Sequence, residues 1–151
     1  MRVFRVADSR FPLFDGTGAR LTGGRWNSPG KALIYAAETF SAALLEILVH
    51  SNLGRVPKTH AVIEINIPNS VAIESVEGDE LRGWDADDHT VSRAFGDRWL
   101  EERRSAVLLV PSIVTQGHER NVLINPEHAD FGKITASKPK NVQWDKRLFK
   151  R

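Results

Sequence analysis

Residues 23–46, GGRWNSPGKALIYAAETFSAALLE, form a glycine-rich turn followed by a short apolar strand and a helix. Three polar residues occupy distinctive positions in this unit. Arg25 follows the Gly-Gly turn, Tyr35 closes the strand, and Glu46 faces out of an otherwise apolar helix. Glycines let the backbone approach a ligand closely, while a strand and a helix hold side chains rigidly. These residues by themselves indicate a concave site for something anionic.

The helix of this unit is expected to begin after Thr39 or Ser41, either of which can cap it. Glu46 lies at the edge of its apolar face, where small neighbours leave room for a ligand. Periodicity alone favours a surface glutamate that pairs weakly with His50, four residues on. The apolar residues of this face recur at 3.6-residue spacing, and they are Phe40, Ala43, Leu44, Ile47 and Leu48.

The rest of the chain is dominated by strands, with one further helix. HAVIEINI at 60–67 alternates as a half-buried strand does, and AVLLV at 106–110 predicts a strand buried on both faces. Gly96 weakens the second helix by about 1 kcal/mol relative to alanine. Two main helices among strands, without repeats or an internal boundary, predict a single α+β domain. The other expected elements are strands at 1–7, 71–75 and 121–124, loops at 8–21 and 77–88, and a helix at 90–104 that turns Val91, Phe95, Trp99 and Leu100 inward.

Composition is that of an ordinary soluble globular protein: 151 residues, of which 41% are hydrophobic and 26% charged. No apolar run approaches the roughly 18 to 20 residues that span a bilayer, and the first residues lack an apolar signal segment. With zero cysteines the chain has no disulfide framework and no thiolate metal site. We therefore expect a cytoplasmic protein without membrane contact.

The net charge of +2 is unevenly distributed. Residues 138–151 carry six cationic side chains against Asp145 alone, a net charge of +5, which leaves −3 for residues 1–137. We accordingly divide the chain into a main domain at 1–137 and a basic tail at 138–151, which is part of the same domain or a docking segment. Such a tail can touch nucleic acid, although a solvated surface or a docking strand is commoner.

Several chemistries are disfavoured by spacing. The five histidines show no metal-ligand pattern, so no metal is expected. Ser112 lies in VPSIV, which lacks the Gly-x-Ser-x-Gly context of a hydrolase nucleophile, and a strand-end hydrogen bond is its simpler role. Neither a dinucleotide-binding glycine fingerprint nor a phosphate-binding P-loop is complete.

An arginine, a tyrosine, a glutamate and a serine in one pocket suit cleavage of a ribosyl bond whose leaving group is cationic. The arginine fork grips a pyrophosphate, and the tyrosine offers a ring face and a hydroxyl. A carboxylate stabilises an oxocarbenium-like transition state. NAD has all the features that these groups would recognise, although the residue set is not unique to it.

The same residues carry a resemblance that covers nearly the whole chain except the basic tail. With the GGRWN-to-LLE spacing, the segments GWD, FGDRWL, VLLVPSIV and ERNVLINPEH resemble the RES-domain family, the toxin half of bacterial toxin–antitoxin pairs. The resemblance implies a mixed β-sheet core like that of the ADP-ribosyltransferase toxins. It identifies Arg25, Glu46 and Ser112 as the motif residues and Tyr35 as the active-site tyrosine.

The resemblance also implies an activity and a partner. Family members degrade NAD as a substrate by phosphorolysis, with phosphate as co-substrate, or by hydrolysis, and no other cofactor is expected. The alternatives are a mono-ADP-ribosyltransferase that modifies a protein and a nucleic-acid-acting toxin that uses the basic tail. The expected partner is an Xre-type helix-turn-helix antitoxin in a hetero-oligomer, with DNA reached only through it.

Three further residues are candidates for substrate binding. Arg5 is either a second phosphate-facing arginine or a plain strand-surface residue. Asn27 and Asn125 are expected to line or brace the site, although asparagine is common in turns for local reasons. His50 is a candidate for tuning Glu46.

Overall fold

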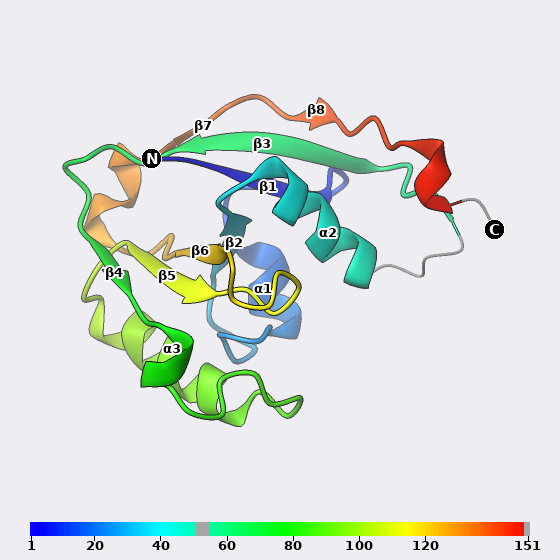
Figure 1. Cartoon of the computed structure of the whole chain (residues 1–151). Coiled ribbons are helices and arrows are strands. Elements are labelled where there is room, and N and C mark those ends of the chain that lie inside the picture. The colour runs from blue at the N-terminus through cyan, green and yellow to red at the C-terminus, as the bar shows by residue number, and fades with distance from the viewer. Residues whose placement is uncertain (51–54, 150–151) are drawn as a thin grey trace.

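The computed structural model describes residues 1–50 and 55–149, and within them eight strands form one twisted mixed sheet (Figure 1). The strand order is β4-β5-β6-β2-β1-β3-β7, with β8 also paired to β3. In this part of the chain the β4–β5 pair is parallel and the other pairs are antiparallel. The strands are β1 (Arg2–Asp8), β2 (Ile34–Ala37), β3 (His60–Asn66), β4 (Ile73–Ser75), β5 (Val107–Pro111), β6 (Arg120–Ile124), β7 (Thr135–Ala136) and β8 (Lys140–Asn141).

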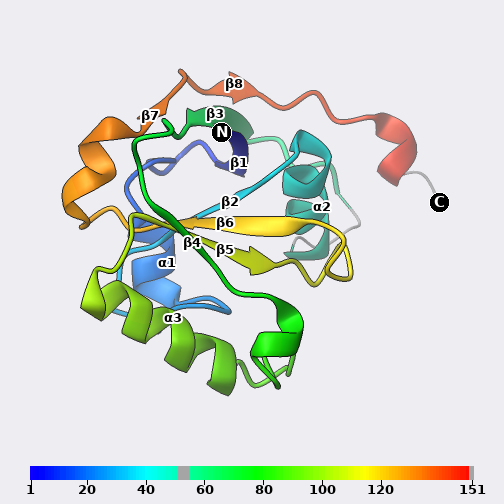
Figure 2. The same ribbon diagram turned by 60° about the vertical axis from the view of Figure 1, so that its left-hand side comes forward.

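Two main helices cover the sheet, as the sequence predicts. They are α2 (Phe40–His50) and α3 (Thr90–Glu102). In Figure 2, α3 lies at the bottom of the view, and β7 and β8 lie at the top. Thr39 is the residue that caps α2, because its hydroxyl accepts a hydrogen bond from the Ala42 N–H at 3.1 Å. Short 3-10 turns complete the fold at η1 (Gly78–Glu80), η2 (Ala129–Lys133) and η3 (Lys146–Phe149). The α+β, single-domain prediction is confirmed.

Two local predictions are wrong. The expected loop at 8–21 contains a helix, α1 (Thr17–Thr22), which follows Gly16 in the left-handed region (φ 75°). Its six residues bury no side chain, so it has no apolar periodicity for the sequence to reveal. On α2, Phe40 was expected on the buried face but is 39% exposed; it is the first residue of the helix, and its ring lies 6.2 Å from that of Phe4.

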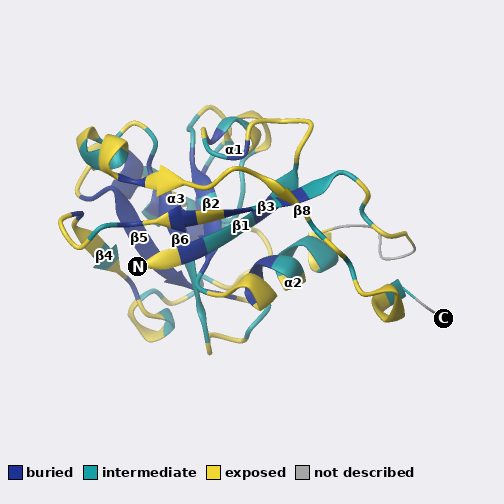
Figure 3. Ribbon diagram, turned by 90° about the horizontal axis from the view of Figure 1, so that it is seen from above, coloured by how far each residue is buried: buried dark blue, intermediate teal, exposed yellow. Residues whose placement is uncertain are grey.

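The alternation of residues along β2 separates the two faces of the sheet. Ile34 and Ala36 contribute to one cluster that also contains apolar residues of β1, β3, β5 and β6, and we call this the inner face. Tyr35 and Ala37 point to the opposite, outer face. In Figure 3 the buried residues are concentrated in these strands and in the sides of the helices that contact them.

Each main helix packs on a different part of the outer face. Ala42 and Ala43 of α2 pack over β1 and the end of β2, with Val6 and Ala37. Trp99 of α3 packs over β5 and β6, in a cluster that includes Trp26, Leu108 and Leu123. The candidate site lies between the regions that the two helices cover, over Tyr35 of β2.

Part of the basic tail completes the sheet. In β8, Lys140 and Asn141 pair antiparallel with Val62 and Ala61 of β3. Lys150 and Arg151 lie outside the described residues. Docking of the tail protects the outer edge of β3, which would otherwise expose unpaired backbone groups.

Candidate active site

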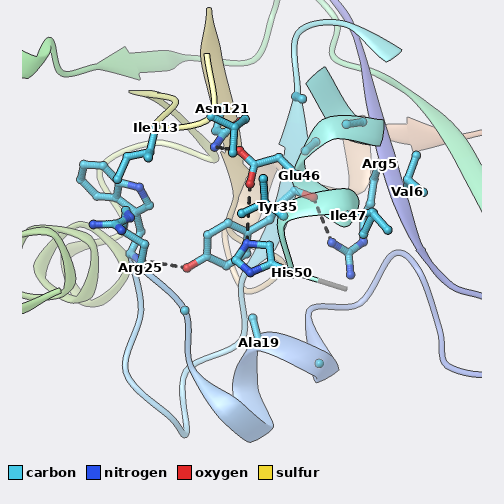
Figure 4. Close-up of a pocket in the computed structure, with 18 of the residues that line it drawn as sticks. Arg5, Val6, Ala19, Arg25, Tyr35, Glu46, Ile47, His50, Ile113 and Asn121 are labelled. Atoms are coloured by element: carbon cyan, nitrogen blue, oxygen red, sulfur yellow. Dashed lines mark hydrogen bonds and ion pairs between the residues drawn. The ribbon is translucent and has the colours of Figure 1, made fainter. Parts of the chain in front are cut away.

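A cavity of about 560 Å³ opens on the outer face between α2 and the first turn of α3 (Figure 4). Its walls come from β1, β2, α1, α2, α3, β6, the turn after Gly23, the end of β5 and the segment that follows it. The volume falls within the roughly 300–1,000 Å³ common for small-molecule sites. Arg25, Tyr35 and Glu46, the three residues singled out in the opening stretch, all line this one cavity.

Glu46 projects from the last turns of α2 into the cavity, with its side chain 26% exposed. Its Oε1 atom accepts a hydrogen bond from Asn121 Nδ2 at 3.0 Å and a long one from the Ser112 hydroxyl at 3.4 Å. Its Oε2 atom lies 3.7 Å from His50 Nε2. The carboxylate is therefore held in one orientation from two strand ends and from its own helix.

Burial opposes the charge of Glu46, and its polar partners favour it. Desolvation alone would raise the pKa of this carboxyl, but the contacts with His50, Asn121 and Ser112 lower the pKa below its ordinary value of 4.5. The same contact with Glu46 raises the pKa of His50 above 6.5, against the opposing effect of partial burial. Glu46 is thus an anion at neutral pH, as stabilisation of a cationic transition state requires.

Arg25 stands on the opposite wall and is fixed by backbone carbonyls. Its Nη1 group donates to Trp84 O at 3.1 Å and to Ala86 O at 3.0 Å, which uses both hydrogens of that nitrogen. The Nε and Nη2 edge has no hydrogen-bond acceptor among the described residues. An arginine edge of this kind presents two parallel donors, which is the geometry that binds a phosphate in bidentate fashion.

Hydrogen bonds and a close backbone contact hold the loop that carries Arg25 against α3. The Ser92 hydroxyl donates to Arg25 O at 2.7 Å, and Asp97 accepts from both the backbone N–H and the hydroxyl of Ser28. A Cβ atom on Gly96 would lie 1.8 Å from Trp26 O, so α3 and the loop are in contact through their backbones. The glycine that weakens the helix by propensity is what allows this close approach.

Tyr35 forms the floor of the cavity, and its hydroxyl is occupied. The hydroxyl donates to Asn27 Oδ1 at 2.7 Å and accepts from Trp26 N at 3.0 Å. Burial, the largest influence, raises the pKa of Tyr35 far above its ordinary value of 10.0. The hydroxyl is therefore a poor acid or base, and the ring face is the larger surface that Tyr35 offers to a ligand.

The other predicted residues divide into neighbours of the site and one outlier. Asn27 is fully buried and braces Tyr35, and Arg5 lines the cavity while donating to Leu13 O and Tyr35 O at 2.7 and 2.9 Å. Burial lowers the pKa of Arg5, although Asp15 partly offsets this. Asn125 is not among the described residues that line the cavity. It follows the far end of β6, where its side chain accepts from Glu127 N, so the structure does not bring it to the cavity with the other predicted residues.

Three lining residues were missed by the sequence reasoning: Asn121, Arg93 and His89. A polar residue at the start of the apolar strand β6 was a detectable signal for Asn121, but nothing in the sequence pairs it with Glu46. His89 has a left-handed backbone (φ 61°) before α3, and burial, aided by the nearby arginines, lowers its pKa below 6.5.

Among the described residues, no group of three acidic or histidine side chains could hold a metal ion, and no helix is long and apolar enough to cross a membrane.

Comparison with known proteins identifies the class to which this fold and site belong. The family model described as the RES domain matches residues 2–145. The chain is 41% identical over 140 residues to a Sphingobium protein named "Prs ADP-ribosylating toxin", covering 90% of this chain and 86% of that one. It is 35% identical to a "Toxin Res" of Photorhabdus laumondii, covering 99% and 98%. The chain therefore belongs to the RES-domain family of toxins.

A solved structure shares the fold. The match is to a chain of the M. tuberculosis MbcT–MbcA toxin–antitoxin complex, with a TM-score of 0.75 over 93% of this chain and 83% of that chain. The identity is 19%, so this likeness shows the fold alone. The family match extends to residue 145 and thus includes β8 of the basic tail.

Proposed function

We propose that this protein cleaves the bond between nicotinamide and ribose in NAD and passes the ADP-ribosyl group to an acceptor. The observation that carries the proposal is the placement of the Glu46 carboxylate, which is held by three polar neighbours in a cavity lined by arginines. A cavity with one fixed anion among cationic groups suits a substrate with both a positive centre and phosphates, and NAD is such a substrate.

In the proposed step, Glu46 faces the ribose carbon as the glycosidic bond breaks. The bonding electron pair leaves with nicotinamide, which becomes neutral, and positive charge develops on the ribosyl group. The carboxylate stabilises that charge, while Arg25 holds the phosphates and Tyr35 supports the nicotinamide ribose. A nucleophilic atom of the acceptor then bonds to the ribose carbon, and any proton that this atom carried passes to solvent. Electrostatic stabilisation of this kind contributes about 10²–10³-fold in rate per group.

Ser112 and Asn121 act through Glu46 in this scheme. Both contact Oε1, so their expected role is to keep the carboxylate turned toward the cavity and ionised. Little acid catalysis is needed, because the leaving group departs neutral from a cationic bond. The Tyr35 hydroxyl, which already makes two hydrogen bonds within the protein, is therefore not needed as an acid.

Three forms of the reaction differ in the acceptor of the ADP-ribosyl group. Water gives hydrolysis, inorganic phosphate gives phosphorolysis, and a protein side chain gives mono-ADP-ribosylation. The third form is favoured by one observation, the name "Prs ADP-ribosylating toxin" of the relative that is 41% identical. We carry it as the second candidate function.

An antitoxin partner is part of the proposal. It is supported by the shared fold with a protein solved in a toxin–antitoxin complex and by the relatives named toxins. We expect a helix-turn-helix antitoxin of the Xre type to form a hetero-oligomer with this chain.

The reaction is tested by incubating purified protein with NAD and measuring nicotinamide and ADP-ribosyl products by mass spectrometry. Parallel samples contain buffer alone, added phosphate, or added cell protein. We expect nicotinamide release in at least one condition, and the product mass identifies the acceptor. NAD that stays intact in all three conditions would refute the proposed function.

A further inference from the structure

The cavity carries more positive charge than its own residues neutralise. Arg5, Arg25 and Arg93 line it, and among the described residues none of the three has a carboxylate within ion-pair distance. Glu46 is the one acidic residue among the described lining residues. Excess cationic charge in a concave site favours an anionic ligand. Five of the ten other described arginines are paired with carboxylates, namely Arg2, Arg10, Arg104, Arg120 and Arg147.

Arg93 is the member of this group that the proposed reaction does not yet use. It lies in the first turn of α3, where its Nε atom donates to Gly24 O at 2.7 Å. That single bond uses the one hydrogen on Nε and fixes the side chain against the loop. The Nη1 and Nη2 groups have no acceptor among the described residues, so four N–H donors remain at the end of the side chain.

The first turn of α3, which carries Arg93, is joined to the loop that carries Arg25 by paired contacts. Consecutive residues of α3, Ser92 and Arg93, bind consecutive carbonyls of the loop, those of Arg25 and Gly24. Arg25, Arg93 and His89 all line the cavity, and after burial the two arginines are the largest influences that lower the pKa of His89. Arg5 is on the other side of Tyr35 and Glu46 from Arg25 (Figure 4).

We propose that Arg93 is a second diphosphate-binding residue and that, with Arg25, it clamps the two phosphates of the substrate. Arg25 offers its Nε/Nη2 edge and Arg93 offers its Nη1/Nη2 end, so each guanidinium takes one phosphate. The inference rests on the proposed function for the identity of the substrate as NAD. Two separate guanidiniums match two phosphate charges better than a single arginine does.

The test measures binding of ADP, which contains the diphosphate but cannot undergo the reaction, by calorimetry. Arg93→Ala removes both the charge and the contact with Gly24 O. Arg93→Gln keeps an amide donor that can reach that carbonyl but removes the charge. Arg98→Ala is the matched control, because Arg98 is an exposed arginine on the same helix that does not line the cavity. Melting curves check that every variant is folded.

We expect both Arg93 variants to weaken ADP binding about tenfold, the size of one charge-assisted hydrogen bond. Their affinity should also depend less steeply on salt than that of the wild type, because one ionic contact is lost. Arg98→Ala should match the wild type in both respects.

Three results would overturn the clamp: wild-type affinity in Arg93→Ala, wild-type affinity and salt dependence in Arg93→Gln, or no ADP binding by the wild-type protein. The second would show that Arg93 only supports the loop. A protein that binds ADP through Arg93 but leaves NAD intact would retain the clamp and refute the proposed reaction, so the two failures are distinguishable.

Discussion

Replacing Gly96 with alanine tests the contact between α3 and the loop that carries Arg25. The new Cβ atom would lie 1.8 Å from Trp26 O, whereas ordinary contact begins at 3.4 Å, so helix and loop must separate by roughly 1.6 Å. Forcing extra atoms into a packed site costs about 1–3 kcal/mol, and the upper end applies because both partners are backbone. Alanine returns about 1 kcal/mol through helix propensity. The net expected loss is about 2 kcal/mol.

The assay is unfolding by urea, with a thermal melt beside it. A loss of about 2 kcal/mol corresponds to a melting temperature lower by about 4–8 °C for a protein of this size. Gly132→Ala is the control, because a Cβ there meets nothing within 4 Å and its backbone is not left-handed. We expect the control to unfold like the wild type. If Gly96→Ala is as stable as the wild type or more so, the backbone contact between α3 and the loop does not constrain either of them.

Three other predictions concern the cavity itself. Asn121→Asp places a second carboxylate 3.0 Å from Glu46, so like-charge repulsion should raise the pH below which activity falls and lower NAD turnover at least tenfold; an unchanged pH–rate profile would exclude this role. His50 has a raised pKa, so its stabilising contribution is full below 6.5 and is lost as pH rises through the raised value. The free-energy gap between wild type and His50→Gln should therefore shrink as the pH rises above 6.5, and a constant gap would argue against the pair. Tyr35→Phe leaves Trp26 N and a buried amide oxygen without their partner and should cost about 1–3 kcal/mol in urea unfolding, whereas a neutral change would mean that the hydroxyl is dispensable.

The strand and helix that carry the site were predictable because their patterns are local. The alternation in β3 and the apolar run of β5 both correspond to observed burial, and the turn–strand–helix order of residues 23–46 is the order found. Arg25, Tyr35 and Glu46 could be nominated because each is a polar residue at an unusual place in such a pattern. Their roles in catalysis stay predictions until activity is measured.

The missed residues depend on contacts between distant parts of the chain. Asn121 reaches Glu46 across 75 positions, and Arg93 reaches Gly24 across 69. No local periodicity encodes such pairs. The sequence shows that Gly96 is unfavourable in a helix, but not why a glycine is needed there. The need comes from the close approach of Trp26 O, which exists only in the folded chain.

The proposed role of Glu46 is tested most directly by the rate of nicotinamide release from NAD by the wild type, Glu46→Gln and Glu38→Gln. The Glu46→Gln substitution keeps the shape of the side chain without its charge. Glu38 is a matched control, because it is similarly exposed (29%) and paired, with Arg120, but does not line the cavity. We expect a loss of about 10²–10³-fold for Glu46→Gln and a near-wild-type rate for Glu38→Gln. Full nicotinamide release by Glu46→Gln would contradict the proposed role of Glu46.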